Sequence, residues 1–330
     1  MPFAVCFVKR FREKRKSVLS GVTAQFNRRG VVQLTRLFGP ARVFRRTNVA
    51  PEVLMLQTLR YLASSEFYIH NSDNNGIGQS TSFDGVNAIL NCIAGAAGRF
   101  VRWPPLQQRQ QMKQRVLGTY GLPEVVGMLD CTHVQFSAGG LQQEDFRDRR
   151  NNLSLNIQCV CDDRFIIRSF SATWPGRTHD AFVLAVSYMQ SEVFELFEQG
   201  LIDGCLLGNS GYGNGRPWLL TPFRNPENAA QRRYNAALRR ARALLKRRWH
   251  ILAGIIRVRS SRKAQLIIAA CIVLHNLAKM WQMPDQFDEY LPVIPQQPFD
   301  QPPNDPRFEL LQAGLDGPRQ RLRVIHHYFA

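Results

Sequence analysis

The chain has 330 residues, with 43 Lys and Arg against 25 Asp and Glu, a net charge of +18 at pH 7. Its hydrophobic share of 45% and charged share of 21% exclude a disordered chain and favour a globular protein with one large domain and a small one. The positive charge is clustered and indicates a polyanionic partner, for which we expect nucleic acid. An anionic membrane surface or a generally basic surface are the alternatives.

Cysteine usage and hydropathy indicate the compartment. The seven Cys residues are scattered and odd in number, which favours a reducing environment, and we interpret Cys159 and Cys161 as core residues. No sequence stretch reaches the roughly 18 apolar residues of a membrane helix, so we expect no membrane. The basic run at residues 9–16 is either a nuclear import signal or a frayed arm. We expect a nuclear protein, with the cytoplasm as a second location.

The first part of the chain is predicted to be a basic arm, residues 1–48, followed by a helical segment, residues 49–118. Pro51 begins one helical stripe, a polar turn with Gly follows, and Ser80 and Thr81 are candidate caps for a second helix. This is the outline of a helix-turn-helix. Its groove-facing side would carry Gln79, Ser80, Thr81, Asp84 and Asn87. Asp84 would repel phosphate there.

From Pro123 the apolar period changes to two, which predicts a buried strand ending at Asp130. Two further strands are expected at 153–162 and 164–174, then a helix at 181–198 and a short strand at 204–208. A long helix is expected at 226–252 and a buried helix at 266–280. These elements predict an α/β domain over residues 119–283, followed by a mostly loose Pro/Gln-rich tail over residues 284–330.

Asp130 has the setting of a metal ligand, because a carboxylate at a strand end is held by rigid backbone. Two-metal cleavage of phosphodiesters needs several carboxylates that converge from separate elements, since Mg²⁺ prefers oxygen ligands. A strand-end Asp also commonly caps the following turn, and this alternative stays open.

Six sequence blocks together resemble the PIF/Harbinger transposases and the Harbinger transposase-derived nucleases. They are GMLDCTH at 127–133, WPGRTHD at 174–180, LLGNSGY at 206–212, RPWLLTP at 216–222, RYN at 233–235 and LHNL at 274–277. Their order and spacing are compatible with the family over about residues 120–280. The helical pair upstream is similar to the family's DNA-binding segment.

The resemblance implies an RNase H-like nuclease domain of the DDE type that uses Mg²⁺ or Mn²⁺. It assigns catalytic and metal-binding roles to Asp130 and Asp180. The family's other two acidic positions fall at Asn209 and Lys246. His133 and His179 lie in the same motifs, where each is either a structural residue or a metal contact.

These two departures predict a damaged metal site. Asn209 keeps one carbonyl ligand but lacks a charge, and Lys246 would bring an ammonium group to the place of a dication. At about 4 Å such a repulsion is several kcal/mol, even at an effective dielectric near 20. No Asp or Glu lies between Gln231 and Gln265 to substitute. We therefore expect cleavage to be impaired or lost.

The long helix is basic along its polar side and carries no acid. A solvated helix face normally alternates in sign, so we interpret this one as a phosphate-binding surface, with a plain solvated face as the alternative. The predicted nucleic-acid-binding residues are Arg239, Arg240, Arg242, Arg247 and Arg248.

Three functions from different classes fit the sequence. The favoured one is a domesticated, DNA-binding homologue of the Harbinger transposase-derived nucleases with little or no phosphodiester cleavage. The others are an active metal-dependent nuclease and a nuclear scaffold that binds a Myb-like protein, a partner class that the resemblance implies. A decayed element without a selected role is a further alternative, and the sequence predicts no oligomeric state.

Overall fold

The structure is a computed structural model that describes residues 26–39, 49–64, 77–137, 144–190, 192–213, 215–242, 255–283, 321–322 and 324–326. The chain forms two compact units. Unit 1 comprises residues 1–100, 134–140 and 246–291, and unit 2 comprises residues 101–133, 141–245 and 292–330.

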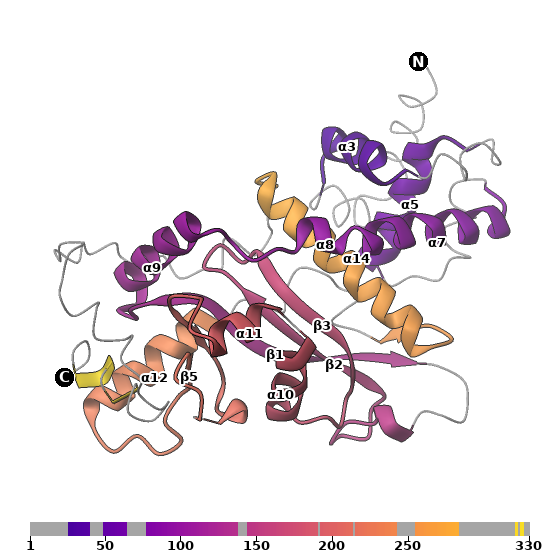
Figure 1. Cartoon of the computed structure of the whole chain (residues 1–330). Coiled ribbons are helices and arrows are strands. Elements are labelled where there is room, and N and C mark those ends of the chain that lie inside the picture. The colour runs from indigo at the N-terminus through magenta and orange to yellow at the C-terminus, as the bar shows by residue number, and fades with distance from the viewer. Residues whose placement is uncertain are drawn as a thin grey trace. The chain divides into compact units, whose positions relative to one another are not determined.

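Unit 2 is built on a mixed β-sheet (Figure 1). Its strands are β1 (Val125–Ser137), β2 (Ser154–Cys161), β3 (Ile167–Pro175), β4 (Cys205–Leu207) and β5 (Leu219–Leu220). The spatial order is β3-β2-β1-β4-β5, with β2 and β3 antiparallel and β1, β4 and β5 parallel. The predicted α/β class is confirmed, and the sheet is consistent with an RNase H-like domain.

Alternation along β1 gives the sheet of unit 2 two apolar faces. Val125 and Met128 belong to a core that includes Met112 of α9 (Leu106–Tyr120) and Tyr234 of α12 (Ala229–Arg242). The neighbouring residues Val126 and Leu129 belong to a second core. That core contains residues of α10 (Asp180–Gln190) and α11 (Glu192–Glu198). The sheet is therefore covered by helices on both faces, which explains why β2, β4 and the first five residues of β1 are buried.

Strand β1 is longer than the sequence predicted, because it continues seven residues beyond Asp130 to Ser137. The segment after Asp130 keeps an alternation of inward and outward side chains, with Val134 and Phe136 buried. Phe136 and Ser137 pair in parallel with β6 (Ile256–Arg257) inside unit 1. Asp130 is therefore a mid-strand residue, and the expectation that it ends the strand is wrong.

The other predicted elements of unit 2 are present. The helix expected at 181–198 is divided into α10 and α11, and the short strand is β4. Helix α12 is described to residue 242, so the rest of the predicted long helix lies outside the described residues. Most of the tail also lies outside them. Its described residues include Val324 and Ile325, which are buried in the first core of unit 2.

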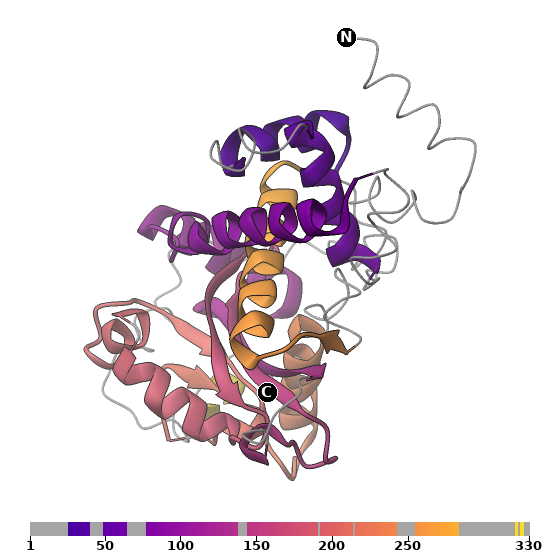
Figure 2. The ribbon, with the colours of Figure 1, turned by 90° about the vertical axis from the view of Figure 1, so that its right-hand side faces the viewer.

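Unit 1 contains the predicted helical pair, α5 (Pro51–Ser64) and α7 (Gln79–Gly95), together with the short α8 (Ala97–Phe100). The long helix α14 (Ser261–Met280) runs across α7, as both ribbon views show (Figure 2). By length and composition α14 is apolar enough to cross a membrane, but most of its apolar stretch is buried. Burial of this extent is typical of a helix in the core of a folded unit.

Unit 1 also contains a helix, α3 (Arg28–Phe38), inside the segment that the sequence predicted to be a basic arm. Asn27 caps it, accepting a hydrogen bond of 2.9 Å from the Gly30 amide. Val31, Leu34 and Phe38 form its buried stripe. The pattern was missed because the basic residues between these apolar positions dominate the composition of the segment.

Candidate functional site

Three segments of unit 2 bring Asp130, Asp180 and Asn209 together. Asp130 lies on β1, Asp180 is the first residue of α10, and Asn209 follows β4. Strands β1 and β4 are neighbours and run parallel, so residues at and beyond the end of β4 reach the same region as the middle of β1. All three side chains are partly exposed. Two of the predicted acids and the predicted Asn position therefore form one cluster.

The amide of Asn209 joins the two carboxylates. Its Nδ2 donates one hydrogen bond of 3.0 Å to Asp130 Oδ1 and another of 3.2 Å to Asp180 Oδ2. An Asn amide has two N–H donors, so both are used on carboxylates. Hydrogen bonds to ionised acceptors are the stronger kind, and here the amide group lies where two negative charges converge. Two donor hydrogens thus lie between the carboxylates.

The backbone holds Asn209 in this orientation. Asn209 caps the 3₁₀ turn η2 (Ser210–Tyr212), and its Oδ1 accepts a hydrogen bond of 2.6 Å from the Gly211 amide. Rotating the amide group by half a turn would aim its NH₂ at that N–H and its oxygen at the carboxylates, with repulsion at both ends. The carbonyl oxygen of Asn209 is therefore turned away from Asp130 and Asp180.

A second Asn holds the other oxygen of Asp180. Nδ2 of Asn156, on β2, donates to Asp180 Oδ1 at 3.1 Å and to the carbonyl of Thr178 at 2.9 Å. Asn156 is fully buried. Its two hydrogen bonds fix the start of α10 against β2 and present Asp180 to the cluster. The Asp180 carboxylate thus accepts amide donors on both oxygens.

The two motif histidines make other contacts. His133 Nδ1 lies 3.2 Å from Ser154 Oγ, and Ser154 in turn donates to Asp148 Oδ2 at 3.4 Å. His179 Nδ1 accepts from the backbone amide of Ala181 at 3.3 Å. Both imidazoles are exposed. These bonds fit structural roles for Nδ1 of each ring.

Cys159 and Cys161 are core residues of the sheet, as predicted. Cys159 is fully buried, and burial raises the pKa of its thiol to about 12. Cys131 follows Asp130 on β1 and accepts a hydrogen bond of 3.0 Å from the hydroxyl of Tyr212. Burial raises the pKa of Cys131 as well, with a further contribution from the charge of Asp180. Both sulfurs are therefore protonated thiols beside the acidic cluster, and poor ligands for a hard ion.

The donor set does not fit a pair of divalent ions. Two carboxylates supply charge, and Asn209 presents N–H groups to them where a further oxygen ligand would be needed. Among the residues that the structure describes, no group of three or more His, Cys, Asp or Glu side chains is placed to hold a metal. The cluster offers at most the two carboxylates, and the amide already satisfies one oxygen of each.

The structure does not describe the side chains of several predicted site residues. Lys246, Arg247 and Arg248 lie outside the described residues. Arg239, Arg240 and Arg242 lie on the last turns of α12, where the structure describes the backbone and not the side chains.

Asn156 and Gly211 belong to the site and were missed by sequence reasoning. The signal for Asn156 was available, because an amide inside a fully buried strand needs polar partners. The signal for Gly211 was weaker. A Cβ there would lie 2.7 Å from Asn209 Oδ1 and 3.3 Å from Asp180 Oδ2, a closeness that only the folded site reveals.

The comparisons with known proteins concern the segment that contains this cluster. A family model described as a DDE superfamily endonuclease matches residues 129–276, the segment that holds all three clustered residues. The chain is 32% identical over 291 residues to the mouse protein named "Putative nuclease HARBI1", covering 84% of this chain and 80% of that protein. The human protein of the same name is 30% identical over 323 residues, with 91% and 88% covered.

A plant relative is more distant. The Arabidopsis thaliana "Protein ALP1-like" is 26% identical over 239 residues, covering 66% of this chain and 58% of that protein. No solved structure matches the chain.

Proposed function

Because the chain belongs to the Harbinger transposase-derived nuclease family, we propose that it is a domesticated member that binds DNA and has little or no phosphodiester cleavage. Membership rests on the family model and on the relatives. The loss of cleavage and the binding of DNA are our own inferences from the site and from the charge of the chain.

One observation carries the loss of cleavage: the Asn209 amide donates to both Asp130 and Asp180. A DDE-type domain generally uses divalent metal, and the carboxylates would be its ligands here. Binding an ion between them would mean breaking two charge-assisted hydrogen bonds. Turning Asn209 to offer its oxygen would also break the bond from Gly211. Losing a single group that stabilises a transition state commonly lowers a rate by about 10²–10³.

The DNA-binding part rests on charge. The net charge of +18 gives the chain a field that attracts a polyanion at long range. Helix α12 carries no acidic residue and exposes Arg232 and Arg233, and Arg239, Arg240 and Arg242 follow on the same helix. We propose duplex DNA as the partner and the nucleus as the location, and a Myb-like protein partner is the second candidate in the same compartment.

The test compares wild type and two variants by three readouts: DNA nicking, duplex binding and Mn²⁺ binding. Supercoiled plasmid is incubated with the protein in Mg²⁺ and in Mn²⁺, and duplex binding is followed separately by fluorescence anisotropy. We expect wild type and Asp130→Ala to bind DNA equally and to nick it equally little. Nicking by wild type that disappears in Asp130→Ala would establish an active nuclease instead.

The second variant, Asn209→Asp with Lys246→Glu, places carboxylates at the family's other two acidic positions. We expect calorimetry to detect Mn²⁺ binding by this variant and far weaker binding by wild type. Equal Mn²⁺ affinity of the two proteins would mean that Asn209 and Lys246 do not disable the site.

A further inference from the structure

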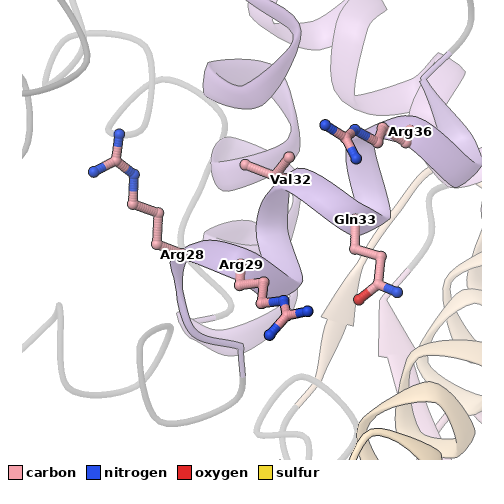
Figure 3. Close-up of a pocket in the computed structure, with 5 residues that line it drawn as sticks. All are labelled: Arg28, Arg29, Val32, Gln33 and Arg36. Carbon is pink, nitrogen blue, oxygen red and sulfur yellow. The ribbon is translucent and has the colours of Figure 1, made fainter.

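The exposed side of α3 is the most basic, least neutralised helix surface in the described part of unit 1. It lines a pocket of about 560 Å³, and the described residues that line this pocket are Arg28, Arg29, Val32, Gln33 and Arg36 (Figure 3). The three Arg residues are exposed, and none has an ion-pair partner among the described residues. No sequence motif pointed to this helix.

The five lining residues share one side of α3. At 3.6 residues per turn they fall within an arc of about 140° around the helix axis. The buried residues of the helix, from Gly30 to Phe38, occupy the opposite arc. The apolar side therefore packs inside unit 1, and the three Arg residues all lie together on the exposed side.

In the described part of unit 1, few carboxylates oppose this charge. Its described residues contain two acids, Glu52 and Asp84, and both are exposed. Asp84 lies on α7, the helix whose Gln79–Asn87 side the sequence predicted to face a DNA groove. On that side Asn87 accepts a hydrogen bond from the ammonium group of Lys263 in α14. Helix α7 is thus less suited to meet phosphate than α3.

Resting on the proposed DNA binding, we propose that α3 is a helix that docks in the major groove of duplex DNA. The groove is about 12 Å wide and admits an α-helix. The Arg side chains would contact phosphates or guanine edges. Gln33, in the middle of the arc, has the bidentate amide that pairs with adenine, and Val32 offers an apolar contact for a thymine methyl.

The residue types select DNA over other polyanions. An anionic membrane surface is bound by a basic helix that also exposes large apolar residues, which insert among the lipids. The arc has one apolar residue, Val32, which is half-buried, and beside the arc α3 exposes a single large apolar side chain, Leu37, at 37%. Gln33 adds a donor and an acceptor that a lipid headgroup layer does not require and a base edge does.

The deciding experiment measures duplex affinity of the full chain by anisotropy over a series of salt concentrations. The test variant is Arg28→Ala/Arg29→Ala/Arg36→Ala. If each Arg releases one counterion, the slope of log affinity against log salt falls by about 2–3, and affinity falls by at least about tenfold. The matched control removes three exposed Arg residues of unit 2, Arg149, Arg150 and Arg164, and is expected to stay within about twofold of wild type.

Each outcome has one meaning once circular dichroism shows that the variants are folded. A loss in the α3 variant alone supports the proposal. An equal loss in both variants, or an unchanged slope in the α3 variant with a loss in Arg239→Ala/Arg240→Ala/Arg242→Ala, overturns α3 docking and leaves DNA binding intact. If wild type does not bind duplex DNA, both the proposed DNA binding and the proposed docking of α3 are wrong. Binding of wild type to anionic vesicles instead would assign α3 to a membrane surface.

A second measurement separates base reading from charge. Gln33→Ala keeps all charges, so we expect an unchanged salt slope. In selection from a random duplex pool, it should lose about tenfold of the preference at one or more adenine positions. An identical preference for wild type and Gln33→Ala would remove Gln33 from the interface.

Discussion

Asn209 Nδ2 lies 3.0 Å from Asp130 Oδ1, so an amide hydrogen lies next to the carboxylate that the sequence predicted to be a metal ligand. The same nitrogen reaches Asp180. The change from Asp to Asn is almost isosteric, and the backbone of η2 needs an acceptor at this position in either case. Asn therefore preserves the turn and replaces one negative charge by donors.

The first prediction is that Asn209→Asp lowers stability without metal and restores Mn²⁺ binding. The variant removes both amide donors and brings a third carboxylate beside two others, which we expect to cost about 1–3 kcal/mol in EDTA. Saturating Mn²⁺ should raise the melting temperature of the variant above its value in EDTA by several degrees, since an ion that binds only the native state stabilises it.

The control for this variant is Asn228→Asp. Asn228 also accepts a backbone hydrogen bond, from Gln231 N at 2.9 Å, and is exposed away from the acidic cluster. It makes the same charge change while keeping its cap. A Mn²⁺-dependent rise of the same size in Asn228→Asp would show that the effect in Asn209→Asp is not specific to the site.

The second prediction concerns Gly211→Ala. Its Cβ would lie 2.7 Å from Asn209 Oδ1, too close for a side chain that cannot retreat without releasing the carboxylates. We expect a loss of about 1–3 kcal/mol in urea unfolding, from the displaced cap and its hydrogen bonds. Gly215→Ala is the matched change, because its Cβ meets nothing within 4 Å. Equal losses of stability in the two variants would show that the loss in Gly211→Ala does not come from its contact with the Asn209 amide.

The sequence predicted which residues meet at the site, but not how they bind one another. Asp130, Asp180 and Asn209 were placed in one family site by their motifs. The direction of the Asn209 amide depends on the Gly211 N–H, and a sequence pattern does not contain the geometry of that turn. Similarly, the period-two pattern gave β1 but not its continuation beyond Asp130, which is stabilised by pairing with β6, over 100 residues later in the chain.

Helix α3 is not evident from the composition of its segment. Its apolar positions have the spacing of an amphipathic helix, but the many Arg residues of the segment predict a basic arm when composition alone is considered. Burial of Leu34 and Phe38 decides the conformation, and this tertiary contribution is invisible to local composition.

The third prediction is that Asp148→Asn reduces stability at neutral pH and loses this effect in acid. Although burial opposes it, backbone hydrogen bonds from Asn152 and Arg150 lower the pKa of Asp148 below 3.8. A carboxyl whose folded pKa is lowered contributes stability above its unfolded pKa and loses it as pH falls through the folded value. The difference between wild type and variant should therefore shrink below about pH 4. Unfolding by urea at pH 7, 4 and 3 measures it.

Asp84→Asn is the comparison for Asp148→Asn, because Asp84 is exposed on α7 of unit 1. We expect this variant to match wild type at all three pH values. If the difference in unfolding free energy between wild type and Asp148→Asn stays constant down to pH 3, the lowered pKa of Asp148 does not explain it.

The fourth prediction concerns a buried ion cluster at the other end of β1 and β4. Lys113 of α9 pairs with Glu124 and with Asp203, 2.6 Å from its Oδ2, and the Lys113 and Glu124 side chains are each 10% exposed. Glu124 lies just before β1 with φ of 58°, a left-handed conformation that non-glycine residues rarely adopt. The ammonium group thus links α9 to the starts of two neighbouring strands.

Lys113→Met should destabilise the protein by about 3–5 kcal/mol, because it leaves a buried carboxylate unpaired. Burial raises the pKa of Glu124, and Lys113 offsets part of that effect. Without Lys113 the pKa of Glu124 rises further. A raised pKa contributes stability below the unfolded value that is lost as pH rises through the folded value. Lys113→Met should therefore gain stability relative to wild type as pH is lowered from 7 to 5.

Wild type should show the complementary behaviour at alkaline pH. Burial alone would lower the pKa of Lys113, but hydrogen bonds to Asp203 and Glu124 outweigh it and raise the pKa above 10.5. The stability from this group is fully present below pH 10.5 and is lost above it. The difference between wild type and Lys113→Met in urea unfolding should hence be constant from pH 8 to 10 and shrink beyond.

The double variant Lys113→Met/Glu124→Gln also removes the buried charge of Glu124, so it should recover much of the lost stability. Its free energy of unfolding should show neither the gain of Lys113→Met between pH 7 and 5 nor the loss of wild type above pH 10. If the double variant is as unstable as Lys113→Met, lost packing of the lysine stem rather than an unpaired carboxylate explains the change.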